Sequence, residues 1–417
     1  MTNVSESLQL RLVPAQIDLL RRLSASAGRK GARIYLVGGT VRDVLVGVPH
    51  LDLDIMYLGG GTRFPDVVAQ ETGGIVDSHT DFGTAKLFVD GLEVDLAAAR
   101  NETYDRPGAL PRVLPGTIVE DAARRDFSIN AMAVSLMEET WGELDDPHGG
   151  LEDLHRGVVR ALHNKSFVDD PTRILRAVRY VGRLGFHLSP ETDSWLKRDI
   201  HCISYMSGDR IRHELERIFR ERKAIDILRM AAEWGILAAV HPAWQVDTSL
   251  LEKHRALAVA PGQQSPVRMF ALVAYSIDEI ALDRVIDRIR PDNPCIKAMR
   301  DVHSLKAKYV DISAAGLLPA DLYFMLHKLD LAAIEVCSSA VAGTVTGDRL
   351  YEYLVRLRHI RPQLNGNDVQ RLGVQEGPEV GRLLHDLMVA RLNGVASSRE
   401  EEIKLVREHL AASELHN

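Results

Sequence analysis

The chain has 417 residues, of which 46% are hydrophobic and 26% charged, as is usual for a soluble globular protein. This length exceeds what one compact core supports and favours about two to four domains. The formal net charge of -7 excludes an overall basic field, so a polyanion such as RNA would have to bind at local basic patches.

The three cysteines, at positions 202, 295 and 337, lie far apart and lack the spacing of a metal-binding motif. We expect them in the core of a protein from a reducing compartment. The first residues, MTNVSESLQLRL, hold no apolar signal core, and no uninterrupted apolar run reaches about 18 residues. These features predict a cytoplasmic protein with no membrane partner.

The first segments alternate helix and strand patterns. Apolar residues recur at helical spacing from Leu10 to about Ala27, which predicts a helix. IYLVGG (34–39) predicts a short buried strand ending in Gly38 and Gly39, followed by a helix through VRDVLVG. Glycines at such a junction let backbone N–H groups approach an anion, helped by the helix N-terminus. The alternative is a plain strand-to-helix turn.

The next stretch, HLDLDIMYL (50–58), places two acids in an apolar run. Successive side chains of a strand alternate between its faces, so Asp52 and Asp54 share the face opposite Leu53 and Ile55. Like charges at neighbouring positions on one face repel unless a cation lies between them. A divalent metal is one explanation, and a pair of solvated aspartates on an edge strand is the other.

A β-hairpin is predicted in AKLFVDGLEVDLAAA (85–99), where Asp90-Gly91 separates two alternating runs. Glu93 and Asp95 share one face of its second strand, which offers a third carboxylate if that strand pairs beside the first. Three acids on one sheet face are hard to explain by packing. They suit Mg²⁺, which prefers carboxylates, waters and substrate phosphates.

After Gly150 the strand patterns almost vanish, and one segment after another shows the helical period, for example TRILRAVRYVGRLGF. The sequence therefore predicts an α+β protein, with mixed strands and helices in the first 150 residues and an all-helical remainder.

Taken together, several motifs resemble the class II tRNA nucleotidyltransferases and bacterial poly(A) polymerases. They are LVGGTVRDVLVGVPHLDLDIMYL (36–58), RRDFSINAMA (124–133), DDPTRILRAVRYVGRLGF (169–186) and GDRIRHELERIF (208–219). The resemblance implies a polymerase-β-like head with a mixed sheet (1–150), then a helical neck (151–225), body (226–345) and tail (346–417). It also implies template-independent addition of CMP and AMP, from CTP and ATP, to the 3′ end of tRNA.

The resemblance also implies roles for individual residues. Asp52 and Asp54 would hold two catalytic metals, with Asp95 or Glu93 as the third acid. One metal would lower the pKa of the RNA 3′-hydroxyl, and the other would neutralise the triphosphate and the departing pyrophosphate. The implied contacts to the nucleotide are Gly38, Gly39, Arg42, Arg124, Arg125, Asp126 and Asn130. Taken alone, the RRDF motif also fits a solvated, capped helix start.

Base selection would fall to the helix near Asp170. Asp170 before Pro171 is typical of a helix cap, which by itself explains the acid. The resemblance assigns Asp170 and Arg173 to the base, because a carboxylate accepts from the amino group of C or A while a guanidinium donates to the ring nitrogen. Uracil and guanine present the opposite polarity. Arg176 and Arg179 follow at helical spacing and are expected beside the nucleotide, unless this is a solvated basic face.

The number of added nucleotides stays open in the sequence. Residues 103–123, with Pro107, Arg106 and Arg112, match the family's mobile loop, which helps CCA-adding members to change from C to A. This loop is not obviously shortened, as it is in CC-adding members, but it lacks the paired arginines associated with many bacterial CCA-adding enzymes. CCA addition is the first expectation. An A-only enzyme, a CC-only enzyme, a poly(A) polymerase and a catalytically silent RNA-binding protein are the alternatives.

RNA contacts are expected in the helical parts. Basic clusters, such as Arg356, Arg358, His359 and Arg361, could neutralise phosphates, although a solvated surface explains each cluster taken singly.

Overall fold

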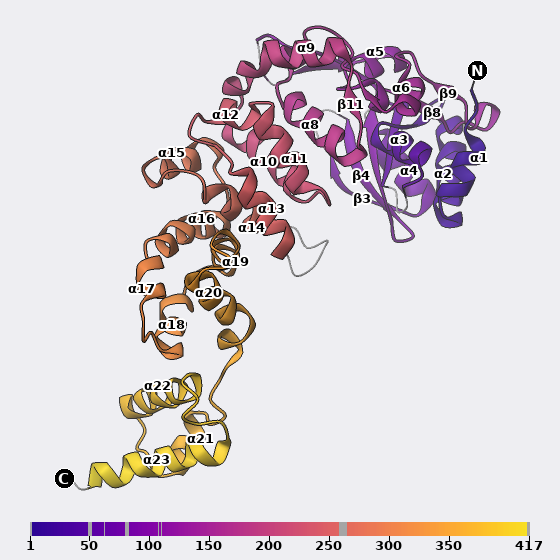
Figure 1. Ribbon diagram of the computed structural model, residues 1–417. Helices are drawn as coiled ribbons and strands as arrows, with labels where there is room; N and C mark the ends of the chain where they lie inside the picture. The colour runs from indigo at the N-terminus through magenta and orange to yellow at the C-terminus, as the bar shows by residue number, and fades with distance from the viewer. Residues whose placement is uncertain are drawn as a thin grey trace. The chain divides into compact units, whose positions relative to one another are not determined.

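A computed structural model describes residues 2–48, 52–61, 63–79, 83–106, 108–109, 111–257 and 265–414 (Figure 1). His50, Leu51 and Pro107, which the sequence analysis used, lie outside these ranges. The chain divides into two compact units, Met1–Ile218 with Asp226–Val240, and Phe219–Ile225 with His241–Asn417. The finer division into head, neck, body and tail stays a prediction. Within the described ranges, no helix combines the length and apolar character needed to cross a bilayer.

The first unit is built on a mixed seven-stranded sheet with the order β3-β4-β5-β2-β1-β8-β9, which confirms the predicted fold class. Its central strands are β1 (Arg33–Val37), β2 (Leu53–Leu58) and β5 (Leu92–Ala98). β2 runs antiparallel to β1 and parallel to β5. The outer strands are β3 (Ile75–His79), β4 (Thr84–Val89), β8 (Ala133–Ser135) and β9 (Leu144–Asp145).

The predicted hairpin is confirmed, because β4 and β5 pair antiparallel through Val89 and Leu92. Its turn residues Asp90 and Gly91 have φ angles of 50° and 81°. Two consecutive left-handed residues are what a two-residue hairpin turn requires, and Asp-Gly tolerates them well.

Successive side chains of β2 point to opposite faces of the sheet, so that one face is apolar and the other includes Asp54. Tyr57 is buried and packs on Phe64 of α4 (Phe64–Thr72), with ring centroids 4.7 Å apart. On the other face Met56 belongs to a small core with Tyr35, Val37, Ala99 and Ala133. Asp54 lies two residues before Met56 and so shares that second face.

Two helices replace the single one predicted from Leu10 to about Ala27, which was wrong in this detail. α1 (Ser5–Arg11) ends before Leu12, and α2 (Pro14–Arg29) begins at a proline. Pro14 has no N–H for the preceding turn and is favoured at the first position of a new helix. The helix predicted after the glycine pair is α3 (Gly39–Val46).

Helices dominate the described residues after Gly150, as predicted. Those that lie wholly or mostly in the first unit are α6 (Gly150–Arg156), α7 (Ser166–Asp169), α8 (Thr172–Leu184), α9 (Pro190–Asp199), α10 (Gly208–Phe219), α11 (Ala224–Glu233) and α12 (Ile236–Val240). Two short strands, β10 (Val158–Val159) and β11 (His187–Leu188), pair parallel to each other.

The second unit is helical in its described part. Its helices are α13 (Thr248–Leu257), α14 (Pro266–Ala274), α15 (Glu279–Ile289), α16 (Asn293–Lys306), α17 (Tyr309–Ser313), α18 (Pro319–Leu326), α19 (Leu331–Ala340), α20 (Val345–Val355), α21 (Gly366–Arg371), α22 (Pro378–Leu392) and α23 (Arg399–Glu414). Residues Leu364, Val369, Leu383, Leu387 and Val406 form a separate core for the last three helices, drawn in yellow in Figure 1. All three cysteines are buried, as predicted.

Candidate active site

A cavity of about 510 Å³ lies in the first unit and gathers most of the predicted site residues. Its lining includes Gly38, Gly39, Asp54, Arg124, Asp126, Asn130, Asp170, Arg173 and Arg176, together with Arg100, Glu102, Tyr104, Pro111, Arg125, Tyr180 and Arg210. Six of these residues are arginines and four are carboxylates. This excess of positive charge suits a polyanionic ligand such as a nucleoside triphosphate.

The acids meet where β2 and β5 pair. Asp54 and Asp95 are direct partners across these parallel strands. Asp52 is exposed and precedes β2, and its carbonyl accepts a hydrogen bond from the Thr40 hydroxyl at 2.9 Å. The same hydroxyl accepts from the Asp54 N–H at 3.3 Å. Thr40, in the first turn of α3, therefore ties the glycine turn to the acidic strand.

Burial and the neighbouring acids together raise the pKa of Asp54 above its ordinary value. Burial raises this pKa, and the negative charges of Asp95 and Asp52 add to the increase. Within the described ranges, no three acidic, histidine or cysteine side chains are close enough to hold an ion by themselves. Asp54 lines the cavity, whereas the exposed Asp52 does not, and both offer carboxylates, the ligand type that Mg²⁺ combines with waters and substrate phosphates.

Asp95 does not line the cavity. Its carboxylate is 3.2 Å from the Lys86 ammonium on β4, and Lys86 also pairs with Glu93. Asp95 is the strand partner of Asp54, whereas Glu93 lies two residues earlier on β5. The register therefore favours Asp95 over Glu93 as the third acid.

The turn at Gly38 and Gly39 lies against the guanidinium of Arg125. Gly38 has φ +67° and ψ −134°, a conformation that is nearly restricted to glycine. A Cβ atom at Gly38 would also be 2.7 Å from a terminal nitrogen of Arg125. Arg125 counts among the charges that lower the pKa of Asp54. Gly38, Arg125 and Asp54 therefore lie near one another in the cavity lining. Such a grouping suits a phosphate, which the turn and the guanidinium would bind, together with a metal cation, which the carboxylate would bind.

Arg124 and Arg125 are held by one acid that the sequence analysis missed. Asp121, on α5 (Ile118–Ala123), accepts from Arg124 at 2.6 Å and from Arg125 at 2.8 Å. Burial would raise the pKa of Asp121, but the two guanidinium groups lower it overall. Their spacing of three and four residues along a helix was the available signal. Glu102 binds Arg124 from the other side at 3.0 Å.

Arg42 lies behind the cavity lining, not in it. Its side chain is only 2% exposed, donates to Asp43 at 2.8 Å and to the Asn130 amide oxygen at 2.6 Å, and lies 5.0 Å from the Tyr180 ring centroid. These contacts do not match the direct triphosphate contact that the resemblance implied. Arg42 instead orients Asn130, because its guanidinium is buried and already bonded.

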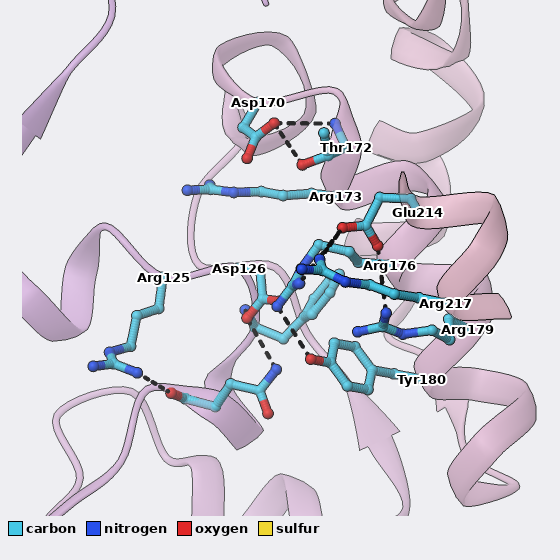
Figure 2. Close-up of polar contacts among 12 residues, drawn as sticks. Arg125, Asp126, Asp170, Thr172, Arg173, Arg176, Arg179, Tyr180, Glu214 and Arg217 are labelled. Carbon is cyan, nitrogen blue, oxygen red and sulfur yellow. Dashed lines mark hydrogen bonds and ion pairs between the residues drawn. The ribbon is translucent and has the colours of Figure 1, made fainter. Parts of the chain in front are cut away.

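Asp126 is buried and forms an ion pair with Arg176 on α8, whose side chain is partly exposed to the cavity (Figure 2). Their closest atoms are 2.6 Å apart, and the Asn130 amide donates to the same acid at 3.0 Å. Burial would raise the pKa of Asp126, but Arg176 and Asn130 outweigh this effect and hold it at about 2. The pair joins the RRDF motif to the helix that carries Arg173.

Asp170 and Arg173 lie side by side in the cavity lining (Figure 2). Asp170 precedes Pro171, the N-cap of α8, and its Oδ1 accepts from the N–H and hydroxyl of Thr172 at 3.1 and 2.6 Å. Asp170 therefore binds the first turn of α8 without being its N-cap residue, and these two contacts use only one carboxylate oxygen. Arg173 is 4% exposed and donates to Ser166 and to the Arg124 carbonyl. Its burial excludes a solvated face at this position.

The arginines that follow on α8 surround a buried acid. Glu214 of α10 accepts from Arg179 at 3.5 Å and from Arg217 at 2.5 Å, with Arg176 at 3.9 Å (Figure 2). Arg179 is buried and does not belong to the cavity lining. The direct nucleotide contact expected of Arg179 therefore finds no support in this geometry.

A second hairpin pairs β6 (Arg100–Thr103), most of which precedes the predicted mobile loop, with β7 (Arg112–Pro115), which lies within that loop. Tyr104 follows β6, lines the cavity and donates to Glu102 at 2.9 Å. Gly108, between the strands, accepts from Arg210 of α10 at 2.9 Å. Arg210 also lies in the GDRIRHELERIF motif, but no local pattern of residues predicts this contact.

Comparisons with known proteins agree with this geometry. Residues 34–160 match the family described as "Poly A polymerase head domain", and residues 185–247 match "Probable RNA and SrmB- binding site of polymerase A". A CC-adding tRNA nucleotidyltransferase of Deinococcus radiodurans is 30% identical, over 98% of this chain and 97% of its own length.

Two further similarities point the same way. An A-adding tRNA nucleotidyltransferase of Geobacter sulfurreducens is 31% identical over 93% of this chain, which spans only 46% of that relative. The solved Thermotoga maritima CCA-adding enzyme in complex with tRNA is 29% identical, with a TM-score of 0.79 over 98% of this chain and 99% of that one.

Proposed function

This chain belongs to the tRNA nucleotidyltransferase family, and we propose that it adds CMP and AMP from CTP and ATP to the 3′ end of tRNA, completing CCA and releasing pyrophosphate. The observation that carries the proposal is one cavity that combines Asp170 and Arg173 with Asp54 and the glycine turn. Base recognition and phosphate chemistry would then occur in the same cavity, with no nucleic-acid template.

Selection of the base would rest on hydrogen-bond polarity. Asp170 Oδ2 accepts no hydrogen bond from the part of the chain that the structure describes, so it can accept from the amino group of cytosine or adenine. Arg173 would donate to the adjacent ring nitrogen. A keto base places a carbonyl against the carboxylate and leaves buried polar groups unpaired, which is strongly unfavourable.

The triphosphate would lie at the glycine turn. Backbone N–H groups at the N-terminus of α3 and the Arg125 guanidinium would bind and orient it. Asp52 and Asp54 are the residues that would hold Mg²⁺, with Asp95 adding negative charge beside them. When bound, such an ion supplies activation of the 3′-hydroxyl and neutralisation of the triphosphate. Asp121 would keep Arg125 in place for this task.

A-only addition is the second candidate. The A-adding relative named above and the absence of the paired-arginine pattern from residues 103–123 both favour it. In that case the cavity would accept ATP with a tRNA that already ends in CC.

The test offers the purified protein tRNA transcripts that lack CCA, CA or A, with Mg²⁺ and each labelled nucleoside triphosphate alone or together. Completion of all three transcripts with CTP and ATP supports CCA addition. Extension of only the last transcript supports A-only addition. Labelling of none, while a control CCA-adding enzyme labels all three, would overturn the proposed function.

A further inference from the structure

Arg210 connects the β6–β7 hairpin to the acid that would read the base. One terminal nitrogen of its guanidinium donates to the Gly108 carbonyl at 2.9 Å, and the other donates to Asp170 Oδ1 at 2.6 Å. Its side chain is 26% exposed and lines the cavity. A planar guanidinium that bonds two partners in this way fixes their relative positions.

Asp170 is oriented by this contact. Its Oδ1 atom accepts three hydrogen bonds, one from Arg210 and two from Thr172. Rotation of the carboxylate would break all three, so Oδ2 is left as the oxygen available to a base. A fixed acceptor is what discrimination between an amino group and a carbonyl requires.

The hairpin is held by the same contact. The Gly108 N–H donates to the Val168 carbonyl at 3.3 Å, two residues before Asp170. Gly108 has φ +68°, and an added Cβ atom would be 3.3 Å from the Tyr205 side chain. Gly108 therefore lies against Val168, just before Asp170, and against Tyr205, just before α10, while the Arg210 guanidinium bonds to both Gly108 and Asp170.

We propose that Arg210 is a positioning residue that couples the β6–β7 hairpin to Asp170 and thereby sets base selectivity. The inference rests on the proposed nucleotidyl transfer. Loss of the guanidinium would remove the charged hydrogen bond to Asp170 Oδ1 and the bond to Gly108 at the same time, which gives both the carboxylate and the hairpin more freedom to move. Incorporation of cytosine or adenine nucleotides would then fall more than incorporation of the keto nucleotides.

The experiment compares wild type, R210M, R210K and the control K197M, which removes an exposed cation on α9 and leaves the contacts of Asp170 and Gly108 intact. The kcat/KM values for ATP, CTP, GTP and UTP are measured on the transcript that wild type extends best. We expect R210M to reduce the preference for amino bases by about 10-fold or more, R210K to restore part of it, and K197M to change it little. Hydrogen exchange of residues 100–115 should rise in R210M.

The possible outcomes separate the two proposals. If wild type extends no tRNA, the proposed function fails. If wild type is active and R210M and R210K lower kcat/KM equally for all four nucleotides, Arg210 has only a structural role and the inference is overturned. Should R210M fail to fold, R210K decides: unchanged base preference with unchanged hairpin protection overturns the inference.

Discussion

Asp54 on β2 and Asp95 on β5 are direct neighbours across a parallel strand pair, and burial together with the Asp95 charge raises the pKa of Asp54. The strands thus hold two like charges together at the edge of a cavity rich in arginine. Such an arrangement costs stability unless a cation or a proton offsets it. Lys86 supplies such a cation to Asp95 at 3.2 Å, which leaves Asp54 as the acid that faces the cavity.

The two acids should differ in their effect on activity. D54N should lower the incorporation rate at least about 10²-fold, because Asp54 lines the cavity and would hold the ion. D95N should act mainly by raising the Mg²⁺ concentration needed for half-maximal rate. Single-turnover incorporation against Mg²⁺ concentration measures both effects. D77N, at an exposed position on β3 of the same sheet, serves as the control, and wild-type rates in D54N would contradict the assignment.

G38A should weaken nucleotide binding. The φ of +67° and ψ of −134° at Gly38 strain any other residue by about 1–3 kcal/mol, and the new Cβ would displace Arg125. We expect a lower free energy of unfolding and a higher KM for the nucleoside triphosphate. The matched control is G343A, where φ is +79° and the space is open, so only stability should fall. An unchanged KM in G38A would argue against triphosphate binding at this turn.

D126N should destabilise the protein by about 3 kcal/mol at neutral pH, because it leaves Arg176 without its buried partner. The pKa of Asp126 is lowered from 3.8 to about 2, so its contribution is complete above pH 3.8 and is lost as the pH falls toward 2. The difference from wild type in urea unfolding should therefore stay constant from pH 8 to about 4 and shrink below that. D193N, which removes an exposed ion pair with Lys197, should change stability by less than about 1 kcal/mol.

The last three helices should depend on one buried acid. Glu402 is wholly buried and accepts from the backbone N–H groups of Gln363 and Leu364 at 2.9 and 2.8 Å, with Arg391 at 3.3 Å. E402Q replaces an acceptor oxygen by a donor and should lower hydrogen-exchange protection there by about 2 kcal/mol. E408Q, at an exposed position, should leave protection unchanged. Equal protection in both variants would show that Glu402 does not hold this region together.

Local patterns in the sequence predicted much of this protein. Asp52 precedes β2, so its predicted place on the strand was wrong. Alternation correctly placed Asp54 on the strand face opposite Ile55, and Asp90-Gly91 predicted the hairpin that brings Asp95 beside Asp54. These predictions succeeded because strand alternation and two-residue turns depend on neighbouring residues. The spacing of Asp121 before Arg124 and Arg125 carried a similar signal.

Tertiary structure alone decided which arginines face the cavity. Arg173 and Arg176 line it, whereas Arg179 binds Glu214 and Arg42 binds Asn130, 88 residues away in the chain. Arg210 reaches Gly108 across 102 residues. A guanidinium on a long flexible stem bonds whichever acceptors the packed elements bring near it, and helical periodicity contains no information about those acceptors.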